Sequence, residues 1–191
     1  MERNIIHIEH DYQFFIGKFD NNLAHKHYAI QLSIPLHEEI QFLVDHSKII
    51  TQQAFLIKPN VEHKLESEHR HLFVLLNPAS TIGHFWNRLI SAPFSEINID
   101  PISQLRKSGL DFLSNKYSAK EFVQNINDII RSHDCHCKSF VHSGDERIDK
   151  AIAYLKEHFA RVIPMEEVSE YCHLSASRFL HLFKENTGIT Y

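Results

Sequence analysis

The sequence predicts an α+β protein in which an antiparallel β-barrel is followed by helices and then by a small all-α unit. Short apolar runs broken by turn residues fill the first half of the chain, and apolar residues at helical spacing fill the second half. We therefore expect a barrel over residues 1–98, helices and a linker over 99–143, and a separate helical unit over 144–191. A chain of 191 residues is long enough for one medium and one small domain.

The barrel is predicted from several short strands. Apolar residues between Tyr28 and Ile34 alternate with smaller or polar ones, which is typical of a half-buried strand. Many short strands at close spacing favour an antiparallel barrel or sandwich. A short helix is expected over His84–Leu89, beginning near Ser80. The other expected strands are Tyr12–Phe19, Ile40–Val44, Ala54–Ile57 and His71–Leu76.

Two helices are expected after the barrel, over Pro101–Leu113 and Ser118–Arg131. Ser118 and Glu121 have the spacing of a capping box at the start of the second helix. An apolar stripe follows on one face of that helix and must pack either on the barrel or on a second subunit. Under the second alternative the chain forms a homodimer through the stripe residues Phe122, Ile126, Ile129 and Ile130.

The last third of the chain predicts three helices, of which the second and third are separated by a brief turn. Pro164 suits the first position of the second helix, and Ser175 suits the N-cap of the third. Leu174 and Phe179 have the spacing of a hydrophobic staple, which fixes the angle at which the chain enters the helix. A helix pair held at a fixed angle is what a helix-turn-helix needs to place its second helix in the DNA major groove.

The outward face of the third helix has the side chains for such a contact. With the apolar residues turned inward, Arg178 and Lys184 can meet phosphates, and His181 can meet base edges. An ordinary helical unit with a solvated polar face is equally compatible with this spacing. The candidate DNA-binding residues are Ser175, Ser177, Arg178, Leu180, His181 and Lys184.

Residues 174–191, Leu-Ser-Ala-Ser-Arg-Phe-Leu-His-Leu-Phe-Lys-Glu-Asn-Thr-Gly-Ile-Thr-Tyr, resemble the first helix-turn-helix of the AraC/XylS family of bacterial transcription regulators. The resemblance includes Ser175-x-Ser177, Phe183-Lys184 and Gly188-x-Thr190, and it extends back to about residue 145. It implies that Ser177, Leu180 and His181 read bases while Lys184 lies near the backbone. Many members have Arg where this chain has His181.

The same resemblance implies a wider organisation. Family members often have a cupin-like sensing barrel and pairing helices in front of the DNA-binding domain, so a small-molecule effector and a homodimer are expected partners besides double-stranded DNA. A second helix-turn-helix is part of the family pattern, so this chain is expected to be truncated or a natural fragment, in which Ile189 and Tyr191 lack the partners that the next elements would supply. A fragment that pairs with a complete regulator and disables it is a further alternative.

Charge argues against tight DNA binding by this unit alone. The whole chain has a formal net charge of −4, and residues 145–191 contain eight acidic and six basic residues, a net charge of −2. Free-standing DNA-binding domains are usually basic. The acidic residues gather in the first two of the three helices, so the third can still present a locally positive face.

Metal binding and catalysis are the main rival interpretations. Cupin enzymes bind metal through His-x-His-x3-Glu and a later His; here His25, His27 and His63 follow that spacing, but Gln31 replaces the acid. His133 with Cys135-His136-Cys137 is a second candidate, although its spacing differs from that of structural zinc sites. Because the chain has 16 scattered histidines and no evident catalytic arrangement, we expect no metal, no cofactor and no enzymatic activity. A metal-dependent cupin enzyme with a helical appendage is the alternative.

The sequence also predicts a cytoplasmic protein without a membrane partner. No apolar run approaches the ~20 residues of a membrane span, and the N-terminus lacks the order of a signal peptide. Three cysteines are too few and too uneven for a disulfide framework.

Overall fold

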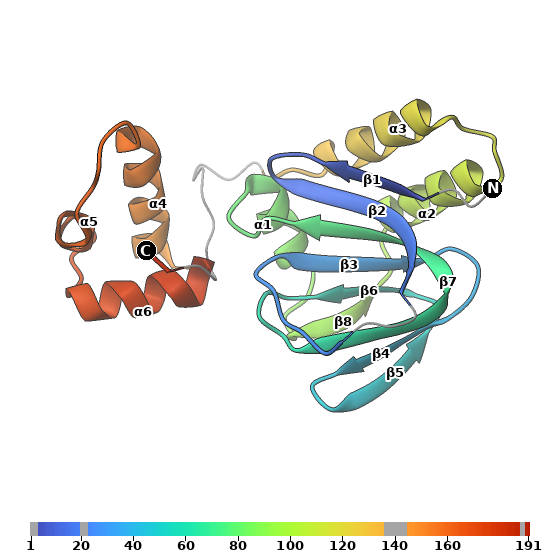
Figure 1. The fold of residues 1–191 in the computed structure, drawn as a ribbon, viewed down its shortest axis with the longest axis horizontal. Coiled ribbons are helices and arrows are strands. Elements are labelled where there is room, and N and C mark those ends of the chain that lie inside the picture. The colour runs from blue at the N-terminus through green and yellow to red at the C-terminus, as the bar shows by residue number, and fades with distance from the viewer. Residues whose placement is uncertain (1–3, 20–22, 136–144, 188–189) are drawn as a thin grey trace.

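The computed structural model describes residues 4–19, 23–135, 145–187 and 190–191. It confirms the α+β class: an eight-stranded antiparallel sheet with helices packed on it, followed by a separate helical unit (Figure 1). The strands are β1 (Ile5–Ile8), β2 (Tyr12–Phe19), β3 (Ile30–Pro35), β4 (Ile40–Val44), β5 (Ser47–Thr51), β6 (Ala54–Ile57), β7 (His63–Leu76) and β8 (Phe94–Ile97). The helices are α1 (Thr81–Asn87), α2 (Asp100–Leu113), α3 (Ala119–Arg131), α4 (Glu146–His158), α5 (Met165–Tyr171) and α6 (Ala176–Thr187).

The long strand β7 organises the sheet. Its C-terminal half pairs with β2 on one side and β3 on the other, so that Leu76 lies opposite both Tyr12 and Ile30. Its N-terminal half pairs instead with β4 of the β4–β5 hairpin. Strand β7 therefore belongs both to the main sheet and to the β4–β5 hairpin, which lies off the main strand order (Figure 1).

Both faces of the sheet are covered, which corrects the expectation of a half-buried strand at β3. All six residues of β3 are buried. Leu32 and its neighbours of the same parity pack against α1, α2 and α3. Gln31 and Ser33 face the other way, toward the interior closed by the hairpin, and both are buried. The alternation in β3 thus does not divide buried from exposed residues. Its apolar residues face the helices, and its polar residues face the buried space on the other side of the sheet.

Helix α3 lies against the sheet and α2. Its capping box is present: the Ser118 hydroxyl accepts from the Glu121 amide, and the Glu121 carboxylate accepts from the Ser118 amide. The Phe122 ring stacks on that of Phe112 in α2, with centroids 4.6 Å apart. Of the four residues predicted to pair subunits, the structure buries Phe122, Ile126 and Ile130 completely and Ile129 in part, all in the core of the chain's own sheet domain. The apolar stripe of α3 therefore packs on the chain's own sheet. Phe122, Ile126 and Ile130 have no exposed surface with which to contact a second subunit.

The helical unit has a hydrophobic core of its own. It is formed by buried residues from all three helices, among them Ile148 of α4, Val168 of α5 and Phe179 of α6. Helix α5 begins one residue later than expected, with Pro164 as its N-cap rather than its first helical residue. Within the described parts of the chain, no helix combines the length and hydrophobicity needed to cross a membrane.

Candidate functional site

The turn between α5 and α6 sets the angle of the candidate DNA-reading helix. Cys172 ends α5, and His173 follows in the left-handed conformation, with φ 55°. The Leu174 amide donates to the Ser169 carbonyl at 2.8 Å, and the His173 amide donates to the Glu170 carbonyl at 2.9 Å. This pair of bonds is a Schellman motif, which terminates a helix and redirects the chain. Sequence inspection missed it because the left-handed position is occupied by His rather than by Gly or Asn.

Helix α6 begins at Ala176, directly after its N-cap residue Ser175. The Ser175 hydroxyl accepts from the Arg178 amide at 3.3 Å, as expected of an N-cap. Leu174 is partly buried and packs against the core of the helical unit, to which Phe179 belongs. Because both ends of the turn are bonded and its apolar residue is packed, the orientation of α6 relative to α5 is determined by the fold of this unit.

The six predicted DNA-binding residues share one property: each is exposed on or beside α6. Among them, His181 lies 3.7 Å from the carboxylate of Glu185, one turn later. The buried residues of α6 face the opposite side, as the spacing predicts. The residues in question are Ser175, Ser177, Arg178, Leu180, His181 and Lys184.

Two further interactions hold the helical unit together. The Glu167 carboxylate accepts hydrogen bonds from the Tyr154 hydroxyl and from the Arg161 guanidinium, which together hold its pKa down at about 2. Tyr191 also packs against other residues of this unit. Its ring packs on Phe179, with centroids 5.4 Å apart, and its hydroxyl donates to the Ile163 carbonyl at 2.7 Å.

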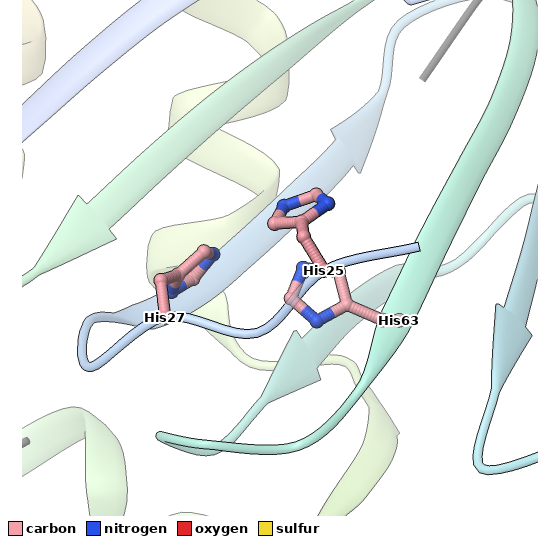
Figure 2. Close-up of side chains that lie close together, drawn as sticks. All are labelled: His25, His27 and His63. Atoms are coloured by element: carbon pink, nitrogen blue, oxygen red, sulfur yellow. The ribbon is translucent and has the colours of Figure 1, made fainter. Parts of the chain in front are cut away.

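The three histidines of the metal alternative lie together (Figure 2). His25 and His63 are joined by two backbone hydrogen bonds of 3.0 and 2.9 Å, and His27 stands two residues further along the same extended segment. One ring nitrogen from each can be chosen so that all three atoms lie within 4.8 Å of one another. Exposure falls from His25 through His27 to His63.

Gln31 completes this cluster from β3. Its amide oxygen lies 3.1 Å from the Nε2 atom of His27 and 3.2 Å from that of His63. Its amide nitrogen donates to the Ser33 hydroxyl at 3.1 Å. Burial lowers the pKa of His63 to about 4, assisted by repulsion from the neighbouring rings of His27 and His25. Three ring nitrogens and one amide oxygen, from three segments of the chain, therefore lie close together.

The second metal candidate is not supported in its described part. Cys135 is disulfide-bonded, so its sulfur is not a free thiolate ligand. The Nδ1 atom of His133 contacts the Ile129 carbonyl oxygen at 2.7 Å. His136 and Cys137 lie outside the described residues.

A cavity of about 920 Å³ lies between the sheet domain and the helical unit. Tyr12 and Tyr28 line it from the sheet side, and Lys156 of α4 and the following Phe159 line it from the helical unit. The Tyr28 hydroxyl is buried and has no hydrogen-bond partner among the described residues. Burial and the nearby Asp149 carboxylate raise the pKa of Tyr28 to about 12.

Comparison with models of protein families gives no match, and neither does comparison with curated proteins. Among solved structures, ToxT from Vibrio cholerae is similar over 95% of this chain and 78% of its own, with 12% identity and a TM-score of 0.48. Protein NMB1881 from Neisseria meningitidis is similar over 39% of this chain and 83% of its own, with 17% identity and a TM-score of 0.34. An RmlC-like cupin from Shewanella frigidimarina covers 36% of this chain and 68% of its own, at 18% identity and a TM-score of 0.33. Similarities at these values do not assign a function.

Proposed function

We propose that this chain is a transcription regulator that binds double-stranded DNA by placing α6 in the major groove. One observation supports the proposal above all: α6 is held at a fixed angle by the bonded α5–α6 turn while its polar face stays exposed. The major groove of B-DNA is wide enough to admit one α-helix, and helix-turn-helix proteins use it in this way.

The exposed side chains divide by chemistry into two groups. Arg178 and Lys184 are cations that neutralise phosphates and contribute affinity for any sequence. Ser177 and His181 have hydrogen-bonding atoms for base edges, and Leu180 offers an apolar contact for a thymine methyl group. Specificity would therefore depend mainly on the second group.

Weak binding by a single unit is expected from the charges around α6. Glu185 lies 3.7 Å from His181 on the exposed face, where it repels phosphates. Glu167 is neutralised by Arg161 within the unit, so this basic side chain is already engaged. The remaining local cations are few, so few phosphates are neutralised, and the affinity should be low with only a modest dependence on salt.

Selection from a pool of random DNA duplexes tests the proposal directly. The purified chain at low salt should enrich one short sequence. His181→Ala should relax the preference at one position of that sequence, at a cost of about 1–3 kcal/mol. Lys184→Ala should weaken binding to all sequences and reduce the slope of log affinity against log salt by about one.

Lys120→Ala is the matched control, because Lys120 is an exposed lysine on α3, outside the helical unit. Its binding should equal that of the unaltered chain. If no sequence is enriched, or if Lys184→Ala and Lys120→Ala behave alike, α6 is not the DNA-reading helix of this chain.

We further propose that a small-molecule effector binds in the cavity between the sheet and the helical unit. The cavity touches both parts of the chain, and Tyr28 is among its lining residues. A ligand there would touch both the sheet domain and the helical unit.

A thermal-shift screen of metabolites should find compounds that raise the melting temperature, since a ligand that binds only the folded state stabilises it. A compound that stabilises Tyr28→Phe as strongly as the unaltered chain would bind without the Tyr28 hydroxyl.

Homodimerisation stays a prediction. Since Phe122, Ile126 and Ile130 are buried within the chain, a pairing surface would have to use other residues. Sedimentation of the purified chain gives its mass in solution and decides whether a dimer forms.

A further inference from the structure

The strongest unexplained feature of the sheet domain is the cluster of His25, His27, His63 and Gln31 (Figure 2). DNA binding through α6 makes no use of it. The backbone bridge between His25 and His63 joins two segments far apart in the sequence and brings their side chains side by side. His27, at the next position of the same parity, points to the same side of its extended segment.

The hydrogen bonds of the three rings define which nitrogen is free. In each ring, Nδ1 lies at hydrogen-bond distance from a backbone carbonyl oxygen, which can only accept. Each Nδ1 therefore carries a proton, and in the neutral form of the ring Nε2 presents its lone pair. Outer-shell bonds of this kind orient the histidine ligands of metal ions. The carbonyl partners are those of Leu23 at 2.8 Å, Ala29 at 3.0 Å and Val61 at 2.8 Å.

Gln31 sharpens this arrangement. When both rings are neutral with the proton on Nδ1, the Nε2 atoms of His27 and His63 can only accept hydrogen bonds. The Gln31 amide oxygen is also an acceptor, and it lies 3.1 and 3.2 Å from these two atoms, so neither contact has a hydrogen to share. The bond from the Gln31 amide nitrogen to Ser33 keeps the oxygen turned toward the rings. A cation among these atoms removes the conflict. Donor atoms bound to one ion at ~2.1 Å lie ~3.0–3.4 Å apart, and both Gln31 contacts fall in that range.

We propose that His25, His27 and His63, together with the Gln31 amide oxygen, bind one divalent transition-metal ion. Imidazole nitrogens suit zinc, iron, nickel and copper, whereas magnesium and calcium prefer sets of oxygen ligands. The Gln31 amide oxygen thus serves in the position where the sequence analysis noted a missing carboxylate. All four ligands are neutral, so no ligand charge offsets the positive charge of the ion.

Metal titration of the full chain tests this proposal, with Zn²⁺ and Co²⁺ as probes after removal of bound metal by a chelator. We expect one ion per chain by calorimetry and, with Co²⁺, a visible absorption band. His27→Ala should weaken binding by more than about 100-fold, because outer-shell changes alone cost 10–100-fold. Gln31→Glu should tighten binding, because a carboxylate adds charge to the fourth ligand.

His37→Ala is the control for surface histidines, since His37 is exposed and outside the cluster. Its metal affinity should match that of the unaltered chain, and circular dichroism should confirm that each variant is folded. No binding by the unaltered chain, equal losses in His27→Ala and His37→Ala, or weaker binding by Gln31→Glu would each overturn the proposal. The last result would mean that the Gln31 amide nitrogen faces the rings and donates to them without a metal. DNA selection does not depend on these residues, so either proposal can fail alone.

Discussion

The ring of Phe122 in α3 packs edge-on against the ring of Phe14 in β2, with centroids 5.9 Å apart and planes inclined at 87°. Both side chains are fully buried. Edge-to-face pairs of this kind contribute beyond the apolar area they bury. The contact fastens α3 to the outer face of the sheet, and it explains why the apolar stripe of this helix is internal to the chain.

Phe122→Ala should therefore lower the free energy of unfolding by about 3–5 kcal/mol, the usual cost of deleting a buried phenyl ring. Urea denaturation measures the change. Gln124→Ala, on the exposed face of the same helix, should remain within about 0.5 kcal/mol of the unaltered chain. If Phe122→Ala instead kept its stability and halved the mass in solution, α3 would be a pairing helix after all.

Stability should decline in mild acid because of His71. Burial lowers the pKa of His71 to about 3, from the ordinary 6.5, with repulsion by His69 as a smaller cause. Above pH 6.5 the ring is neutral in both states, and its full contribution is present. As pH falls from 6.5 toward 3, the unfolded chain takes up a proton that the folded chain does not, so the free energy of unfolding falls.

His71→Leu should make urea unfolding less dependent on pH over this range, even if the variant is less stable at neutral pH. His63, whose pKa is also lowered, should maintain part of the slope. A slope in His71→Leu as steep as that of the unaltered chain would mean that His71 is protonated in the folded state.

Glu167 should make the stability of the helical unit sensitive to stronger acid. Its hydrogen bonds from Arg161 and Tyr154 lower its pKa from the ordinary 4.5 to about 2. The stabilising effect is present above pH 4.5 and is lost as pH falls toward 2. Glu167→Gln should lose stability at neutral pH and show less change between pH 4.5 and 2, as followed by thermal unfolding. Glu170→Gln, an exposed neighbour on α5, should leave the acid profile unchanged.

Removing the acidic group beside the candidate reading face should tighten DNA binding. Glu185 lies one turn after His181 on the exposed side of α6. Glu185→Gln should raise the affinity for duplex DNA in low salt, and the gain should shrink in high salt, where charges are screened. Fluorescence polarisation measures both. Glu39→Gln, an exposed acid in the sheet domain, should have no effect; an equal gain there would indicate a general effect of net charge.

Local sequence predicted much of the fold. The capping box at Ser118 and Glu121 and the N-cap at Ser175 are each formed by residues within three positions of one another, and both are present. The strands β1, β5 and β8 were missed, because most of their residues are exposed or half-buried and their apolar pattern is weak. The turn between the last two helices was predicted, but its left-handed residue was not, because His173 occupies that position instead of a glycine or asparagine.

The candidate sites divide in the same way. The exposed face of α6 follows from the period of one helix, so the positions of Arg178, His181 and Lys184 could be read from spacing alone. Long-range packing alone decided that Phe122 is internal, because an apolar stripe fits a sheet and a second subunit equally well. It also decided that His63 and Gln31 meet His25 and His27, because β7 and β3 bring together residues that the linear sequence keeps up to 38 positions apart.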